Sequence, residues 1–578
     1  MGKINYRAIY EKNHRGWLDM TENPGKYEAL LAGHYSDSNH FVYELIQNAE
    51  DTKASCVVFE YHEDKIVFYH DGKPFNEADV IGVSSMLETT KADDAQTIGK
   101  FGMGFKSVFK YTCEPQIYSD DEAFCIKNYL LPAEIDTDWN YVEQMQWGIS
   151  YALNGGEQFI PFAQSEHLTK VVLPFQKREK SGEIHRIDGS DIILKLKDLE
   201  PEILLFLSTI KCLFWIDKTK GKYEKFSLME QDDANLKICQ LKGNATNSSK
   251  RYTDLYYYKY KKKVAHPKMG NAEVSLAFLT NTQQKSIQKM ENTDIWVYFP
   301  TKDRTGLPCL LHGSFETAVS REKLMRPSEF NSSLLSAAVE LFAEAILDFK
   351  RRELITQNFI RQILMTAFND DTLPGLKTAI TRLFLENELI PNRSGKLSRC
   401  SDVCVAVPFD MADLSTNAYL KGTFARDKEY VLINDEKSAG FSEYYSWLKL
   451  DLKVPVFSIE SWAHRVVDCF QNMHDIADFD VMRDLYEFLD EYKLSEYTKD
   501  FKIARKKSLY EEDVQAFVKK AWPILRVARI LINAESRFIA AYNDAEEAQV
   551  YLSSTSEYHK IAKAAIVLSF ITDDYKAL

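Results

Sequence analysis

Three short motifs within residues 41–109 constrain the fold of this chain more than any other feature. They read FVYELIQNAED at 41–51, DGKPF at 71–75 and GKFGMGFKSVF at 99–109. The first has the apolar spacing of a helix, the second follows two alternating segments, and the third is rich in glycine. Together they predict a helix and a sheet that are joined by a loop suited to phosphate.

The first motif predicts an amphipathic helix with a chemically useful polar face. At about 100° per residue, Glu44, Asn48 and Asp51 lie on one side of this helix. The residues that would pack under a sheet lie on the other side: Phe41, Val42, Leu45, Ile46 and Ala49. In ATP hydrolysis, Glu44 would take a proton from the attacking water, and the neutral oxygen of Asn48 would ligate Mg²⁺. A solvated polar face is the alternative interpretation of this segment taken alone.

The glycine-rich motif predicts an anion site. Gly99, Gly102 and Gly104 allow the backbone to approach a phosphate closely. Residues 105–109 then have the pattern of a helix start, and a helix N-terminus favours an anion. No long βαβ unit surrounds the motif, so a dinucleotide fold is not indicated.

The middle motif follows a predicted hairpin and precedes a predicted lid. Residues 56–61 and 65–69 alternate like two strands, and Asp71-Gly72 then opens a turn. A turn without a ligand is the alternative interpretation here. Residues 76–97 would form a lid that closes over a nucleotide. Within it, Lys91 would reach a phosphate or remain a surface lysine.

In this order the three motifs resemble the GHKL superfamily, which contains the gyrase, heat-shock chaperone, histidine kinase and MutL ATPases. The residues of all three motifs are most similar to those of sacsin-like ATPase proteins. The resemblance implies a Bergerat-type α/β sandwich that binds and hydrolyses ATP with Mg²⁺ and changes shape during the cycle. It implies that Glu44 is the general base and Asn48 the metal ligand. The other nucleotide contacts implied are Asp51, Asp71, Gly72, Lys91, Gly99, Phe101, Gly102, Met103, Gly104, Phe105 and Thr169, which opens the predicted strand TKVVLPF.

The residue that would meet adenine is ambiguous in this chain. The family pattern is Asp-x-Gly-x-Gly, and its Asp accepts a hydrogen bond from the adenine amino group. In HDGKP, strict spacing places His70 at that position. We nevertheless expect Asp71, because an ionised carboxylate accepts from an amino group whereas an imidazole does so only in one tautomer.

The resemblance continues into a second region. Residues 296–301 are predicted as a strand, and residues 310–323 resemble the transducer segment that carries a basic residue to the γ-phosphate. Arg321 is our candidate, because a guanidinium forms bidentate hydrogen bonds to phosphate. Lys302 and Lys323 are the alternatives, and a surface salt bridge is the other interpretation of Arg321.

We predict an α+β protein in three parts. These are an ATP-binding domain at 1–200, an α/β transducer-like domain at 201–350, and a largely helical region at 351–578. The second part should close with a helix capped by Asn331 or Ser332. Its apolar stripe is Leu335, Val339, Phe342, Ile346 and Phe349. Many sacsin-like proteins are longer, so this chain is a candidate for the front portion of one.

Composition limits the partners. A net charge of −13 argues against a protein that coats nucleic acid. Lysines and tyrosines alternate at 250–263, which suits either base stacking or an edge strand, and we prefer the strand. Nine scattered cysteines lack metal-ligand spacing, and no stretch approaches a membrane span, so we expect a cytoplasmic protein.

Three functions are consistent with these residues. We prefer a chaperone-like ATPase that acts on a protein client. Relatives often form a homodimer on ATP binding, and the sequence leaves a homodimer of this chain open. One alternative is a DNA-linked ATPase in microbial, anti-phage defence or DNA maintenance. The other is a nucleotide-binding scaffold with little or no hydrolysis, since one ATPase fold serves many tasks.

Overall fold

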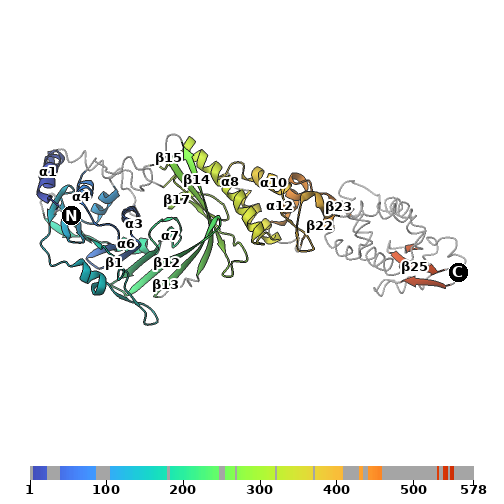
Figure 1. Cartoon of the computed structure of the whole chain (residues 1–578), viewed down its shortest axis with the longest axis horizontal. Coiled ribbons are helices and arrows are strands. Elements are labelled where there is room, and N and C mark those ends of the chain that lie inside the picture. Colours follow the sequence, from blue (N-terminus) through green and yellow to red (C-terminus); the bar gives the residue numbers. More distant parts are fainter. Residues whose placement is uncertain are drawn as a thin grey trace. The chain divides into compact units, whose positions relative to one another are not determined.

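The fold is mixed α+β, as predicted (Figure 1). The computed structural model describes residues 4–22, 40–85, 104–178, 183–246, 254–266, 270–318, 322–368, 372–407, 428–433, 440–458, 530–532, 538–544 and 547–551. The chain divides into two compact units. The first contains residues 1–354 and 362–379, and the second contains residues 355–361 and 380–578.

A 14-stranded sheet forms the centre of the first unit, in the order β17-β16-β18-β15-β14-β13-β12-β11-β1-β2-β8-β3-β4-β5. Its strands are β1 Cys56–Tyr61, β2 Lys65–His70, β3 Gln116–Ser119, β4 Glu122–Lys127, β5 Leu131–Glu134, β8 Thr169–Pro174, β11 Cys212–Asp217, β12 Lys222–Asp233, β13 Leu236–Ala245, β14 Leu255–His266, β15 Gly270–Thr280, β16 Asp294–Val297, β17 Phe299–Arg304 and β18 Leu310–Gly313. Smaller hairpins join β6 Tyr151–Ala152 to β7 Gln158–Phe159, and β9 Gln176–Arg178 to β10 Ile184–Arg186.

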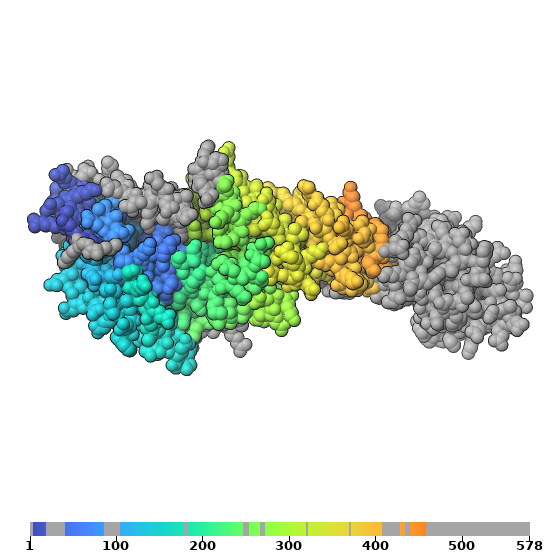
Figure 2. Space-filling model, viewed as in Figure 1, coloured from blue at the N-terminus to red at the C-terminus, as the bar shows by residue number. Residues whose placement is uncertain are grey.

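Parallel pairing of β1 with β11 makes this sheet continuous. Cys56 lies opposite Cys212, and the register runs to Tyr61 opposite Asp217. The strands that precede residue 200 and those that follow it therefore share one sheet and one compact unit. In Figure 2 the cyan and green surfaces, which belong to these two groups of strands, adjoin one another.

The first unit also contains helices. They are α1 Tyr6–Glu22, α3 His40–Asp51, α4 Glu77–Ser84, α5 Tyr141–Glu143, α6 Ser190–Lys197, α7 Ile203–Phe206, α8 Glu329–Arg351 and α9 Met365–Ala367. The 3₁₀ segment η1 spans Gly104–Lys110, and π-helical turns span Gln144–Gly148 and Phe359–Leu364. The predicted helix at 41–51 is confirmed as α3, and the predicted hairpin is confirmed as β1–β2.

Helix α8 confirms the predicted closing helix but corrects its cap. Ser328, not Asn331 or Ser332, is the N-cap, and its side chain accepts from Asn331 N at 3.1 Å. Asn331 is buried within the first turn, because its side-chain amide bonds the backbone of Glu316 and Met325. Phe342, Ile346 and Phe349 of the predicted stripe are buried, whereas Leu335 and Val339 are partly buried.

Among the described residues, α8 is the helix whose length and composition would suffice to cross a membrane. Its most apolar window has a mean hydropathy of 1.3, and 56% of that window is buried inside the protein. The ring of Phe349 lies 5.1 Å from Phe278 of β15 and 5.8 Å from Tyr260 of β14. These contacts are those of a core helix.

Two local predictions were wrong in detail. Residues 296–301 are not one strand, because the chain reverses at Tyr298, which has a positive φ of 63°, and Val297 pairs with Phe299. Residues 105–109 are helical but belong to the 3₁₀ segment η1 rather than to an α-helix. The tighter winding buries Phe105, Val108 and Phe109 in a short span.

The region after residue 351 is mixed in its described part rather than largely helical. Helices α10 Leu376–Glu386 and α12 Phe441–Ser446 accompany short helical segments at Cys400–Asp402 and Trp447–Asp451. The strands are β19 Ile390–Pro391, β20 Leu397–Ser398, β21 Val403–Val407, β22 Glu429–Tyr430, β23 Val456–Ser458, β24 Ile530–Ile532, β25 Phe538–Asp544 and β26 Glu547–Tyr551. Trp447 packs against Phe384 and donates its indole N–H to Thr381 Oγ1 at 2.9 Å.

Candidate functional site

Helix α3 supplies the polar face of the candidate site. Its predicted apolar residues Phe41, Val42, Leu45, Ile46 and Ala49 are all buried, as expected. They join the core cluster that contains Phe59 and Phe68 of the hairpin. Glu44, Asn48 and Asp51 are partly buried on the other face. Within the described part of the chain, the side-chain amide of Asn48 forms no hydrogen bond.

The end of the glycine-rich motif lies beside this helix. Gly104 opens η1, Phe105 is buried, and the ring of Tyr111 lies 5.0 Å from that of Phe41. The structure therefore brings the first motif and the described end of the third, residues 104–109, together. The remaining predicted lid and loop residues lie outside the described residues: Lys91, Gly99, Phe101, Gly102 and Met103.

Lys106 is a buried cation that the sequence analysis missed. Its ammonium donates to Val83 O at 2.7 Å and Tyr129 O at 2.5 Å, so it ties the end of α4 to the turn between β4 and β5. Burial lowers the pKa of Lys106 to about 7. No sequence pattern indicates the two carbonyl oxygens that Lys106 contacts, so in the sequence this residue could not be distinguished from a surface lysine.

Three buried polar residues form a row across β2, β8 and β3. His70 lies opposite Thr169, and Thr169 lies opposite Ser119. The hydroxyls of Ser119 and Thr169 are 2.8 Å apart, and Ser119 Oγ also accepts from Phe75 N at 2.9 Å. Thr169 was predicted from the strand motif, whereas Ser119 was missed. Only the strand register identifies Ser119, because a serine at a strand end carries no signal of its own.

Asp71 is engaged within the fold. Its Oδ1 accepts from Ser55 N at 2.7 Å and Cys56 N at 2.9 Å. Its Oδ2 accepts from the hydroxyl of Ser55 and, at 3.0 Å, from that of Ser165. Two carboxylate oxygens offer about four acceptor positions, and four donors use them. The carboxylate therefore anchors the start of β1 and the segment before β8.

Gly72 lies too close to the end of α3 to carry a side chain. A Cβ at this position would collide with the side chain of Thr52, the residue that follows α3. Lys73 N donates to Thr52 O at 2.9 Å, and Gly72 N donates to Nδ1 of His70 at 3.2 Å. The turn after β2 is therefore fastened to the helix that carries Glu44 and Asn48.

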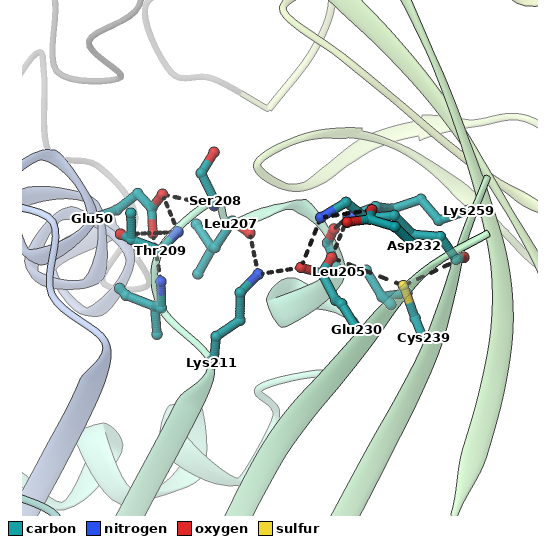
Figure 3. Close-up of polar contacts among 12 residues, drawn as sticks. Glu50, Leu205, Leu207, Ser208, Thr209, Lys211, Glu230, Asp232, Cys239 and Lys259 are labelled. Atoms are coloured by element: carbon teal, nitrogen blue, oxygen red, sulfur yellow. Dashed lines mark hydrogen bonds and ion pairs between the residues drawn. The ribbon is translucent and has the colours of Figure 1, made fainter. Parts of the chain in front are cut away.

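Glu50 links α3 to the entry of β11 (Figure 3). Its buried carboxylate accepts from Ser208 N at 2.7 Å, Thr209 N at 2.9 Å and Ile210 N at 3.0 Å. It also accepts from Thr209 Oγ1 at 3.0 Å. One side chain thus satisfies three consecutive backbone donors, an arrangement that charge makes stronger than neutral hydrogen bonds.

A second ionic cluster continues from this segment into the sheet (Figure 3). Glu230 of β12 accepts from Lys211 at 2.9 Å and from Lys259 of β14 at 2.8 Å. Lys259 also donates to Leu205 O at 2.7 Å, and Lys211 donates to Leu207 O at 3.4 Å. Burial alone would raise the pKa of Glu230, but the neighbouring ammonium groups outweigh it and lower that pKa to about 2. The segment after α7 is therefore fixed to both α3 and the long strands.

The predicted γ-phosphate sensor, Arg321, lies outside the described residues. Of the alternatives, Lys302 pairs with Glu322 at 2.6 Å and Lys323 is exposed. Contact between α3 and this region is aromatic, since the rings of Tyr43 and Phe299 stack with centroids 4.4 Å apart.

The alternation of lysine and tyrosine is a strand, as preferred, in its described part. Tyr257, Tyr258 and Tyr260 of β14 are buried. Lys262 bonds Glu340 and Glu344 of α8, each at 2.8 Å. These aromatic rings are therefore not a stacking surface for bases.

Comparisons with known proteins identify similar sequences over the first part of the chain. Residues 65–229 match the Sacsin domain. Protein NO VEIN from Arabidopsis thaliana is 24% identical over 337 residues, which cover 56% of this chain and 12% of that protein. Human Sacsin is 22% identical over 398 residues, covering 55% of this chain and 9% of Sacsin. The matched region is thus a small fraction of either relative, and it supports a sacsin-like family for this chain.

Proposed function

We propose that the first unit is a GHKL-type site that binds ATP with Mg²⁺ and hydrolyses it. The observation that carries this proposal is that the first motif forms one helix, and that the second motif and the described end of the third, residues 104–109, both lie against it. Asn48 and Glu44 lie on the polar face of α3. The turn that follows His70 is hydrogen-bonded to Thr52, the residue after α3. The segment η1 packs beside α3. This is the arrangement that the resemblance to GHKL proteins implies.

The available side chains fit the chemistry that the proposal needs. Glu44 is a partly buried carboxylate one turn from Asn48, so a water held near both would have a general base. Asn48 offers a neutral oxygen to Mg²⁺. The described residues contain no group of three His, Cys, Asp or Glu side chains that would hold a metal alone. A magnesium ion here would thus take most of its ligands from phosphates and water, as is usual at ATP sites.

The site is also suited to driving a shape change, which is the reason to prefer a chaperone-like switch acting on a protein client. Glu50 and the Glu230 cluster connect α3 through residues 205–211 to β12 and β14. A displacement of α3 on nucleotide binding would therefore be transmitted to the long strands. A DNA-linked ATPase is less favoured, because Lys259, Lys261 and Lys262 are paired with carboxylates.

Removal of the metal provides the test of this proposal. We expect the full chain to bind ATP with Mg²⁺ more tightly than in excess EDTA, by about tenfold or ~1.4 kcal/mol. Asn48→Ala should remove most of that difference, because the variant loses the side-chain ligand. Titration calorimetry of both proteins measures it. Gln283→Ala, at an exposed loop residue, is the control and should behave as the wild type. Equal affinity with and without Mg²⁺ would contradict the proposed metal site.

A further inference from the structure

His70 is held in one tautomer by its own turn. Nδ1 accepts the backbone N–H of Gly72 at 3.2 Å, so it carries a lone pair rather than a proton. A neutral imidazole has one N–H, and here that proton must be on Nε2. The other ring nitrogen therefore faces its surroundings as a hydrogen-bond donor.

Burial keeps this imidazole neutral. His70 is 4% exposed, and burial lowers its pKa to about 4 although the charge of Asp71 opposes the shift. At neutral pH the ring is uncharged. Among the described residues, Nε2 has no hydrogen-bond partner, since the hydrogen bond of this ring is the one between Nδ1 and Gly72 N. An acceptor atom of a ligand would give this N–H donor a partner.

Of the polar groups near this row, the N–H of His70 is the one whose role as a donor is fixed. The four acceptor positions of Asp71 are used by Ser55, Cys56 and Ser165. The hydroxyls of Ser119 and Thr169 bond each other, and either one can be the donor. These hydroxyls can thus exchange donor and acceptor roles to suit a ligand. The hydrogen bond from Gly72 N to Nδ1 prevents His70 from changing its role.

We propose that His70 is the base-reading residue of the nucleotide site, and that it donates from Nε2 to an acceptor on the edge of a purine. This inference rests on the proposed function and names its substrate class. A carboxylate in this position accepts a hydrogen bond from the amino group of adenine. It disfavours the carbonyl oxygen of a 6-oxopurine, because the carboxylate and that oxygen are both acceptors. An N–H donor instead meets N1 of adenine or the O6 oxygen of a 6-oxopurine. The site therefore takes ATP, GTP and ITP without the strong selection for adenine that a carboxylate imposes.

The experiment compares nucleotide affinities of the full chain and of a variant that restores the carboxylate. ATP and ITP differ at position 6 and not at position 2, so their affinity ratio isolates the contact. For the wild type we expect Kd values for Mg²⁺-ATP and Mg²⁺-ITP within about tenfold of each other. For His70→Asp we expect ATP to be preferred by about 100-fold or more, since a mismatched buried polar group is rejected strongly. His185→Asp makes the same change at an exposed histidine and should keep the wild-type ratio.

Each outcome decides the inference. Binding of ATP with rejection of ITP by about 100-fold in the wild type would overturn it while leaving the proposed function intact. An unchanged ratio in a folded His70→Asp variant would also overturn it. Binding of no nucleotide at all would overturn the proposed function and this inference together. The wild-type ratio decides the matter even if His70→Asp fails to fold.

Discussion

Replacing Glu44 with alanine is expected to lower ATP turnover by about 10²–10⁴-fold while changing the affinity for Mg²⁺-ATP by less than about threefold. The carboxylate of Glu44 lies on the partly buried face of α3, one turn before Asn48. As general base it would contribute to the transition state and little to ground-state binding, so the loss should fall on kcat. Steady-state turnover and titration calorimetry measure the two quantities.

The control for this substitution is Glu157→Ala, which removes an exposed carboxylate in the loop between β6 and β7. It should turn over ATP at the wild-type rate. A parallel fall in turnover and affinity for Glu44→Ala would contradict the general-base assignment. Binding without turnover in the wild type would favour the scaffold alternative.

Replacing Glu50 with alanine is expected to destabilise the first unit by about 2–4 kcal/mol, because three backbone donors lose one acceptor. These donors belong to Ser208, Thr209 and Ile210, and the side chain of Glu50 is buried. Water can reach Ser208, which is exposed, so the loss should be smaller than for three fully buried groups. Urea unfolding followed by a signal from the first unit measures the change.

Thr209→Val is the matched control for this variant. It removes only the hydroxyl donor at 3.0 Å and should cost about 1 kcal/mol. If Glu50→Ala costs no more than Thr209→Val, the carboxylate is not the principal acceptor for this segment. The proposed path from α3 to β11 would then lose its main connection.

Local patterns were sufficient to predict the elements that carry the site. The period of residues 41–51 fixes both the helix α3 and its buried face, and alternation fixes β1, β2 and β8. These segments have strong, short-range preferences that the tertiary structure keeps. The identity of the chemical face on α3 could therefore be proposed from the sequence.

Contacts between distant residues were not predictable in the same way. Glu50 meets residues about 160 positions later, and the row of His70, Thr169 and Ser119 depends on the register of three strands. The engagement of Asp71 depends on Ser55 and Ser165, which no local rule assigns to it. The hydrogen bonds of Asp71 change the assignment of the residue that contacts the purine, because His70 rather than Asp71 keeps a polar atom without a hydrogen bond.

Local rules also failed where a competing local interaction prevailed. Asn331 has the side chain of a helix cap, but it bonds Glu316 and Met325, and Ser328 takes the cap three residues earlier. Tyr298 lies within a run of strand-forming residues and yet turns the chain. Neither Ser328 as the cap nor a turn at Tyr298 was predicted from the sequence, because both depend on how the surrounding segments pack.

Hydrogen exchange of the full chain, with and without Mg²⁺-ATP, tests the location of the site most directly. The Glu44→Ala variant can be used to keep the nucleotide intact. We predict that exchange slows in residues 40–52, 65–73 and 169–174, which form α3, β2 with its turn, and β8. Residues 390–407 of the second unit should be unaffected. Saturating nucleotide that leaves α3 and β2 unchanged, or that protects only the second unit, would contradict the account.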